Sequence, residues 1–397
     1  MSKPQTDDEL IAIRRHLHAH PELSGQEEET ARYIESTLRG FGLQAMERVS
    51  ETGVVALIEG SEPGPTLAYR ADIDALPIEE ANRCDYASQH KGVMHACGHD
   101  VHTTIGLGVA RALMARRDEL RGRVKMIFQP AEEATPEEEP VGAERMVCDG
   151  VLEDPEVEAV YALHCMPSLD VGLIGHTGGP VWAGSELVDI AVHGQKAHAA
   201  YAHEGIDAIS VAAQMLVSLQ QVISRRVDGR QSCVFTIGTI EGGENYNVLP
   251  DEVRMQGILR GLSQEVMDQA RGLIEAQAPA LAAAMGATAE VAFTAGARPV
   301  INDRRLEAQA VGIIEEHLGA TALTRWQPQL GAEDFSSFSR RLPGCYLFLG
   351  IRNEAAGITS ALHTPTFDVD EGCIGLGVSA MSEVLLNTAR RGPATTS

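Results

Sequence analysis

The chain has 397 residues, a length that allows two domains at roughly 150 residues each. Hydrophobic residues make up 44% of the chain and charged residues 22%, as in ordinary globular proteins, which excludes a disordered or low-complexity chain. The formal net charge of −24 predicts no nucleic-acid or membrane partner, because phosphates and anionic lipids repel an acidic protein. Seven scattered cysteines, and a first segment without the profile of a secretory signal, predict a cytoplasmic location.

The first part of the chain alternates amphipathic segments with short apolar runs. Residues 7–18 and 27–39 have the periodicity of helices, whereas residues 54–58, 124–128 and 157–163 are typical of buried strands. This alternation predicts an α/β domain with a mostly parallel sheet.

A different pattern begins near residues 178–180. It predicts the order β-α-β-β-α-β, with strands at 186–192, 232–240, 252–259 and 287–293 and helices at 208–223 and 264–285. That order is the ferredoxin-like α+β unit. The first pattern returns after residue 298, with helices expected at 303–318 and 372–388 and a strand at 345–349. We therefore predict a discontinuous first domain, residues 1–183 and 298–397, interrupted by a smaller domain at residues 184–297.

Several strands are followed by residues that can perform chemistry. Asp72 and Asp74 follow an apolar run at residues 66–69, Glu132 and Glu133 follow another, and His164 closes a third. Ligands of open α/β sheets bind beyond the carboxyl ends of the strands, so these side chains are expected to converge.

Cys97 and His99 form a Cys-x-His pair that can bind one cation from a loop before a helix at 102–114. The alternative is a cytosolic cysteine beside solvated histidines. Glu132 and Glu133 would point opposite ways in an extended chain, so that one binds metal while the other addresses water or substrate. Their alternative is a solvated charge run continuing into residues 137–139, which lie outside the residues that the structure describes.

His164 and His363 can complete a site with mixed ligands. Each alone is more typical of a hydrogen-bonded structural histidine, but together with a thiolate and carboxylates they suit two borderline transition-metal ions. His16, His18 and His20 are discounted as ligands because alternate residues of a helix diverge. Asp72 or Asp74 is expected to accept the free N–H of a ligating histidine, although either could instead cap a helix or turn.

Six ordered motifs resemble one enzyme family. They are residues 15–24 (RHLHAHPELS), 70–77 (RADIDALP), 94–100 (MHACGHD), 128–133 (FQPAEE), 162–164 (ALH) and 331–335 (GAEDF). The chain is similar over residues 10–385 to the metal-dependent amidohydrolases that include hippurate hydrolase, N-acyl-amino-acid amidohydrolases and auxin-conjugate hydrolases, within the aminoacylase and carboxypeptidase superfamily.

The resemblance implies a catalytic α/β domain and an inserted lid or dimerisation domain. It implies a site for two divalent ions (zinc, manganese, cobalt or nickel), with Cys97, His99, Glu133, His164 and His363 as ligands and Glu132 as general base. In the lid it implies that His198 reaches an active site, often the partner subunit's, and that Asn247 and Arg260 bind substrate.

The function that follows is hydrolysis of the amide bond of small N-acyl amino acids by a homodimer or homotetramer joined through the lid. Two alternatives stay open. One is a dipeptidase or a diaminopimelate-type deacetylase of the same superfamily, and the other is a non-catalytic metal-binding protein with this fold.

Overall fold

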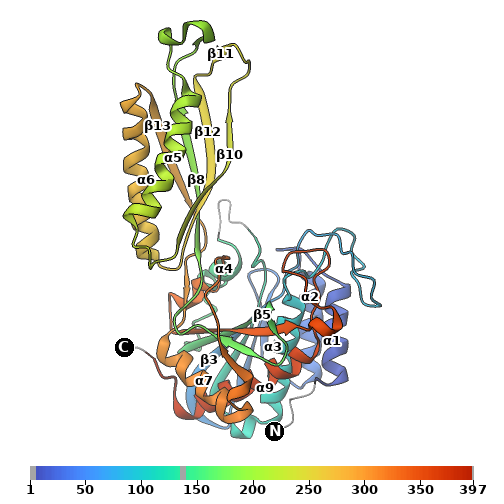
Figure 1. Cartoon of the computed structure of the whole chain (residues 1–397). Coiled ribbons are helices and arrows are strands. Elements are labelled where there is room, and N and C mark those ends of the chain that lie inside the picture. Colours follow the sequence, from blue (N-terminus) through green and yellow to red (C-terminus); the bar gives the residue numbers. More distant parts are fainter. Residues whose placement is uncertain (1–5, 135–139, 396–397) are drawn as a thin grey trace. The chain divides into compact units, whose positions relative to one another are not determined.

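The structure is a computed structural model that describes residues 6–134 and 140–395, which form two compact units. The first unit contains Met1–Gly179, Ile301–Gln327 and Ser337–Ser397, and the second contains Pro180–Val300 and Pro328–Ser336 (Figure 1). The sequence-based boundaries at 183/184 and 297/298 stay predictions. They leave Pro328–Ser336 in the catalytic domain, whereas this segment belongs to the second unit of the structure.

The first unit is built around a sheet of eight strands in the order β1-β2-β4-β3-β5-β16-β6-β15. The inner strands β4, β3, β5 and β16 pair in parallel, while β1 and β2 run antiparallel to their neighbours. This sheet confirms the predicted α/β class. The strands are β1 (Met46–Val49), β2 (Gly53–Glu59), β3 (Glu62–Asp72), β4 (Arg121–Gln129), β5 (Ala159–Asp170), β6 (Ile174–His176), β15 (Leu323–Arg325) and β16 (Gly344–Arg352).

The helices of the first unit pack on this sheet and on one another. They are α1 (Asp8–Ala19), α2 (Glu28–Gly40), α3 (His99–Ala115), α4 (Gly142–Cys148), α7 (Arg304–Leu318) and α9 (Gly372–Arg391). The buried helix α3 contacts α1 and α9, and α9 also contacts α7. Helix α9 has the length and hydropathy of a membrane span, but most of it is buried in this unit, as expected of a core helix.

Short elements complete the chain. They are the 3-10 turns η1 (Arg117–Glu119), η2 (Ala199–Glu204), η3 (Ala320–Ala322) and η4 (Glu354–Ala356), the helix α8 (Ser336–Ser339), and the pair β7 (Pro180–Trp182) and β14 (Val300–Ile301).

The second unit has the predicted ferredoxin-like topology. Its antiparallel sheet has the order β10-β12-β8-β13, formed by β8 (Gly184–His193), β10 (Cys233–Gly242), β12 (Glu252–Gly261) and β13 (Thr288–Ala295). Helices α5 (Ala208–Arg226) and α6 (Gln264–Ala284) pack together against it, with their apolar sides in one core. Alternating burial along β8 reflects this one-sided cover. A small pair, β9 (Ala197–His198) and β11 (Val248–Leu249), carries one predicted site residue.

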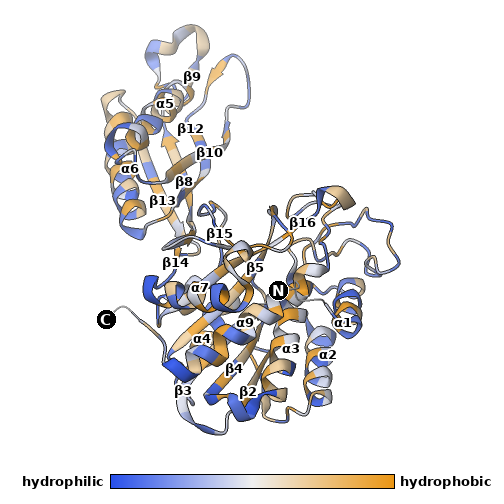
Figure 2. Ribbon diagram, turned by 60° about the horizontal axis from the view of Figure 1, so that its bottom comes forward, coloured by the Kyte–Doolittle hydropathy of each residue, from blue (hydrophilic) through white to orange (hydrophobic). Residues whose placement is uncertain are grey.

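Hydropathy explains most of these elements. Figure 2 shows hydrophilic residues on the helix surfaces and hydrophobic residues along inner strands such as β4. The main departure is the start of α3, which begins at His99 and not at residue 102. Its first turn is buried yet polar, so no apolar periodicity marks it in the sequence.

Candidate metal centre

Gly98 sets the geometry of the segment that carries Cys97 and His99. Its φ of +89° lies in the left-handed region, and it precedes the first residue of α3. A Cβ at position 98 would lie 3.0 Å from the Cβ and 3.2 Å from the Sγ of Cys165, so a side chain would crowd this contact. Gly98 thus makes a tight turn between Cys97 and His99, and the side chains of both neighbours are buried.

His99 presents one ring nitrogen that can accept a cation. Its Nδ1 lies 3.0 Å from Oδ1 of Asp74, and its Nε2 is buried without a hydrogen-bond partner. Burial disfavours the charged ring, but Asp72 and Asp74 outweigh burial and raise the pKa of His99 to about 10. The surrounding carboxylates therefore favour a positive charge on this ring. A metal ion at Nε2 would supply that charge in place of a proton, so the residues fit a metal.

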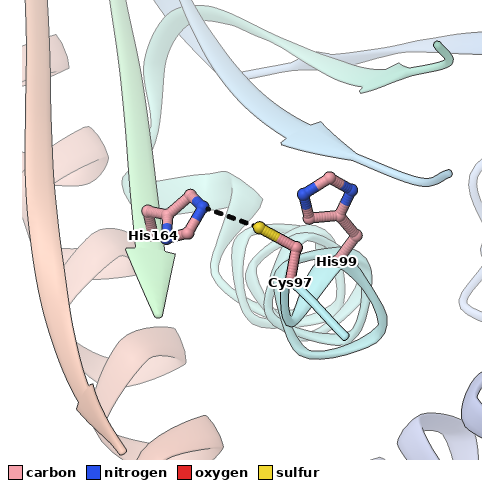
Figure 3. A group of neighbouring side chains, drawn as sticks. All are labelled: Cys97, His99 and His164. Carbon is pink, nitrogen blue, oxygen red and sulfur yellow. Dashed lines mark hydrogen bonds between the residues drawn. The ribbon is translucent and has the colours of Figure 1, made fainter. Parts of the chain in front are cut away.

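His164, in β5, faces Cys97 (Figure 3). Its Nε2 lies 3.6 Å from Sγ of Cys97, and its Nδ1 donates to the carbonyl of Cys165 at 2.7 Å. This second hydrogen bond fixes the tautomer that leaves a lone pair on Nε2. Burial and the neighbouring His102 hold the pKa of His164 well below its ordinary value, so the ring is neutral, as metal coordination requires.

Glu133 and His363 also converge on Cys97. Nε2 of His363 lies 3.3 Å from Sγ of Cys97 and 3.1 Å from Oε1 of Glu133. The N–H of Glu133 donates to Oδ2 of Asp74 at 3.0 Å, and the N–H of His363 donates to the carbonyl of Ala96 at 2.8 Å. One donor atom from each of Cys97, Glu133 and His363 lies within 4.8 Å of the others, the spacing of a group that can hold one ion.

Glu132 joins the same cluster. One oxygen of Glu132, one of Glu133 and one nitrogen of His99 all lie within 4.8 Å of one another. The expectation of an extended chain at this point is wrong, because Ala131 has a φ of +53° and the backbone turns there. Both carboxylates therefore reach His99.

The thiol of Cys97 is not disposed to ionise by itself. Burial, Glu133 and Glu132 raise its pKa well above the ordinary value for cysteine. A cation between these groups would reverse this effect, because metal coordination favours the thiolate. Among the described residues, one donor atom of Cys97 also lies within 4.8 Å of one of His99 and one of His164.

Asp72 and His102 form a buried support beside the cluster. Nδ1 of His102 donates to Oδ1 of Asp72 at 2.6 Å, and its Nε2 accepts the N–H of Cys165 at 2.8 Å. Both ring nitrogens are therefore engaged by the protein, which argues against His102 as a ligand. Arg70 donates to Oδ2 of Asp72 at 2.7 Å and, with His102 and His99, helps to hold the pKa of this buried carboxyl well below its usual range.

The N-terminal histidines, which are discounted as ligands, contact other protein groups. His18 is buried, with Nδ1 2.8 Å from Oδ2 of Asp100 and Nε2 3.2 Å from Oε1 of Glu80. His16 stacks on Tyr33, with the ring centroids 4.0 Å apart. These histidines attach α1 to its surroundings.

The three predicted lid residues lie in the second unit. His198 is exposed in β9, and its Nδ1 accepts the N–H of Ala200 at 3.2 Å. The carbonyl of Asn247 accepts the N–H of Ala199 at 2.9 Å, so Asn247 lies beside the β9–β11 pair. Arg260, in β12, donates to the carbonyl of Leu330 at 2.8 Å. Their roles in catalysis and substrate binding stay predictions.

Comparison with known proteins identifies the family. The profile described as Peptidase family M20/M25/M40 matches residues 68–387. The chain belongs to this family.

Relatives of this M20 chain include enzymes that act on N-acyl amino acids. It is 39% identical over 370 residues to the N-acetyl-L-cysteine deacetylase of Bacillus subtilis, covering 93% of this chain and 85% of that protein. It is 42% identical over 294 residues to the N-acyl-L-amino acid amidohydrolase of Geobacillus stearothermophilus, covering 74% and 78%. The structure of the Bacillus subtilis YXEP protein, a dinuclear metal binding peptidase from the M20 family, matches with a TM-score of 0.84 at 34% identity, covering 96% of this chain and 98% of that one.

The sequence analysis assigns no role to two buried acidic residues of this M20 chain, Asp100 and Glu27. Asp100 pairs with Arg14, and Glu27 accepts a hydrogen bond from Ala131. These partners lie 86 and 104 residues away in the chain, and no local pattern connects them. The only signal in the sequence was the position of Asp100 directly after His99.

Proposed function

We propose that this M20 protein is a metal-dependent amidohydrolase that cleaves the amide bond of N-acyl amino acids, such as hippurate-like or N-acetyl conjugates. The observation that carries the proposal is the convergence of a thiol, imidazoles and carboxylates around Nε2 of His99, a buried atom that has no hydrogen-bond partner. Relatives named for the deacetylation or hydrolysis of N-acyl amino acids support this substrate class.

We assign two divalent metal ions to the cluster. The ligands of this proposal are Cys97, His99, Glu133, His164 and His363. When bound, such ions supply Lewis-acid chemistry, which lowers the pKa of water and polarises the carbonyl of an amide. The related YXEP protein, described as a dinuclear metal binding peptidase, supports the number of ions. A thiolate ligand favours zinc, cobalt or nickel over manganese, which has the least affinity for sulfur among these four.

Glu132 is the proposed general base. Its carboxylate would take a proton from the attacking water and return that proton to the departing amine. The products are a carboxylate and a free amino acid. The position of Glu132 next to a proposed ligand, with an oxygen within 4.8 Å of a donor atom of His99, supports this role.

The second unit is the proposed lid. His198 would donate a hydrogen bond to the oxyanion that forms during attack, and Asn247 and Arg260 would bind the substrate. Burial lowers the pKa of Arg260 somewhat, but a guanidinium keeps its charge near neutral pH and suits a substrate carboxylate.

We further propose a cytoplasmic homodimer or homotetramer joined through this unit. All seven cysteines are free, which supports a reducing compartment.

A substrate panel tests the proposal. The chelator-treated protein is reloaded with Zn²⁺, Mn²⁺, Co²⁺ or Ni²⁺ and given N-acetyl, N-benzoyl and indole-acyl amino acids together with dipeptides. Release of free amino acid is then measured. We expect metal-dependent release that is fastest from N-acyl amino acids. Faster cleavage of dipeptides would favour the dipeptidase alternative, and no cleavage of any amide with any metal would favour a non-catalytic metal-binding protein.

A further inference from the structure

The backbone enters the Glu132–Glu133 pair in an unusual conformation. Ala131, between the end of β4 and Glu132, has a φ of +53°, in the left-handed region that residues with a Cβ rarely adopt. Ala131 is also buried. Such a conformation costs free energy, so it persists only where neighbouring groups hold it.

Glu27 is the group that holds it. Its side chain is fully buried, and its Oε1 accepts the N–H of Ala131 at 2.8 Å. Its Oε2 accepts the hydroxyl of Thr52 at 2.7 Å. The backbone carbonyl of Glu27 accepts the N–H of Ala31, so the residue is anchored at the start of α2. A carboxylate that directly precedes α2 thus hydrogen-bonds to a turn 104 residues further along the chain.

The position of this carboxylate is electrostatically unfavourable. Burial raises the pKa of Glu27, and the nearby charge of Asp74 raises it further, although the hydrogen bonds from Thr52 and Ala131 act in the opposite direction. An apolar side chain would avoid this cost, so the carboxylate is explained by the two donors that it engages.

A second carboxylate holds the other side of the same turn. Asp74 accepts the N–H of Glu133 at 3.0 Å and also lies 3.0 Å from the ring of His99. The N–H groups of residues 131 and 133 are therefore both fixed, and Glu132 lies between them. The direction in which both glutamate side chains leave the backbone depends on these two hydrogen bonds.

We propose that Glu27 is a positioning residue that holds the turn at Ala131 and thereby directs the carboxylates of Glu132 and Glu133 toward His99 and Cys97. This inference rests on the proposed function, in which Glu133 is a metal ligand and Glu132 the general base. Glu27 acts on them only through the backbone.

Three variants separate positioning from packing. Glu27→Met keeps the length of the side chain but removes both acceptors. Glu27→Gln keeps one carbonyl oxygen for Ala131, while its amide can donate to the Thr52 hydroxyl. Thr52→Val is the matched control, because it removes the other hydrogen bond of Glu27 and leaves the bond to Ala131.

Metal affinity is the first measurement, and it needs no substrate. Co²⁺ is titrated into chelator-treated protein against a competing chelator, and the thiolate-to-cobalt absorption reports the bond to Cys97. We expect Glu27→Met to bind Co²⁺ about 10- to 100-fold more weakly, as when an outer-shell partner of a ligand is lost. Glu27→Gln should bind nearly as the unmodified protein does. Thr52→Val should lower the Tm without lowering the affinity.

Kinetics of the metal-saturated proteins is the second measurement. Glu27→Met should lower kcat while KM changes little, because the proposed substrate contacts lie in the second unit. Adding Ala131→Gly to Glu27→Met should recover part of the loss, because glycine adopts a positive φ without the restraint. Unchanged Co²⁺ affinity and unchanged kcat in Glu27→Met, with only a lower Tm, would overturn the inference.

The two proposals fail in different ways. If the unmodified protein hydrolyses no amide, the proposed function fails, whereas the Co²⁺ titration still tests the positioning of Glu133. If Glu27→Met does not fold, Glu27→Asp replaces it, because the shorter carboxylate cannot reach Ala131 and Thr52 together. Unchanged Co²⁺ affinity and kcat in Glu27→Asp would equally overturn the inference.

Discussion

At the scale of single residues, the adjacent acids Glu132 and Glu133 are expected to differ in role. The N–H of Glu133 is held by Asp74, and its carboxylate lies beside His363 and Cys97. One carboxylate oxygen of Glu132 lies within 4.8 Å of a ring nitrogen of His99. The pair can therefore divide the tasks of holding metal and moving a proton.

Exchanging each acid for its amide tests this division. Glu132→Gln should keep the metal content and lower kcat by about 10²- to 10⁴-fold, because a general base is lost. Glu133→Gln should lower both metal content and rate, because a ligand is lost. Elemental analysis and kinetics of the two variants measure this. Near-normal activity of fully metallated Glu132→Gln would contradict its assignment.

The sequence predicts which side chains converge, but not the hydrogen bonds that fix their backbone. Residues after strands were expected to converge, and Glu132, His164 and Asp74 do lie in one cluster with the Cys97–His99 turn. The ligand and catalytic roles stay predictions. The contact of Glu27 with the site could not be predicted from the sequence. Its hydrogen bond to Ala131 depends on a backbone turn for which the sequence has no recognisable pattern.

At the scale of elements, α1 is attached to the start of α3 by a buried ionic network. Arg14 and Asp100 form a buried ion pair at 2.9 Å, and His18 lies between Asp100 and Glu80, with the ring of Tyr86 at its edge. Burial and Arg14 disfavour a charge on His18, but its hydrogen bonds to Asp100 and Glu80 outweigh them and raise its pKa.

This network predicts a pH-dependent stability. Because the folded pKa of His18 is raised, its stabilisation is fully present below the unfolded value of about 6.5 and is lost as the pH rises through the folded pKa. His18→Gln should therefore lower Tm more at pH 6 than at pH 9. His16 gives a control on the same helix, because burial and His20 lower its pKa and the predicted trend for His16→Gln is the reverse. An equal loss of Tm at both pH values for His18→Gln would contradict a raised pKa of His18 in the folded protein.

The packing of α3 gives a second prediction at this scale. A Cβ at Gly108 would lie 2.5 Å from Cγ2 of Val378 in α9 and 3.3 Å from the Cδ atoms of Leu10 in α1. Gly108→Ala should therefore destabilise the first unit by about 1–3 kcal/mol through overpacking. A Cβ at Gly312, in α7, would have open space around it, and Gly312→Ala should stabilise by up to about 1 kcal/mol. Urea unfolding measures both, and equal effects of the two variants would contradict this packing.

Periodicity sufficed to predict the long elements. The α/β class and the ferredoxin-like insertion are confirmed. The inner strands of the large sheet are continuous buried runs, whereas strands such as β8 in the second unit have one buried side. Short strands were not predicted. The edge strand β1 has only four residues, and β6 and β15 have three each, too few to show a period.

At the scale of the whole molecule, the proposed catalytic groups are divided between the two units. Glu132 belongs to the first unit, whereas His198 is an exposed residue of the second. The proposal that His198 serves a neighbouring subunit therefore depends on an oligomer.

Mixing two inactive variants tests this arrangement. His198→Ala should keep its metal and lower the turnover rate. If His198 donates a hydrogen bond to the oxyanion, the loss of transition-state stabilisation should be about 2–4 kcal/mol. Subunit exchange between His198→Ala and Glu132→Gln should then restore activity, because one mixed site regains both groups. Hetero-oligomers that form without regaining activity would confine His198 to its own chain or remove it from the mechanism.

The proposed function depends on two metal ions, held by Cys97, His99, Glu133, His164 and His363, that enable amide hydrolysis. A titration of the chelator-treated protein tests it most directly: divalent metal is added stepwise while release of free amino acid from an N-acyl amino acid is followed. We expect negligible release without metal and a plateau at two ions per chain. Full activity in the metal-free protein would contradict the proposed function, and so would a protein that binds two ions and still releases no amino acid.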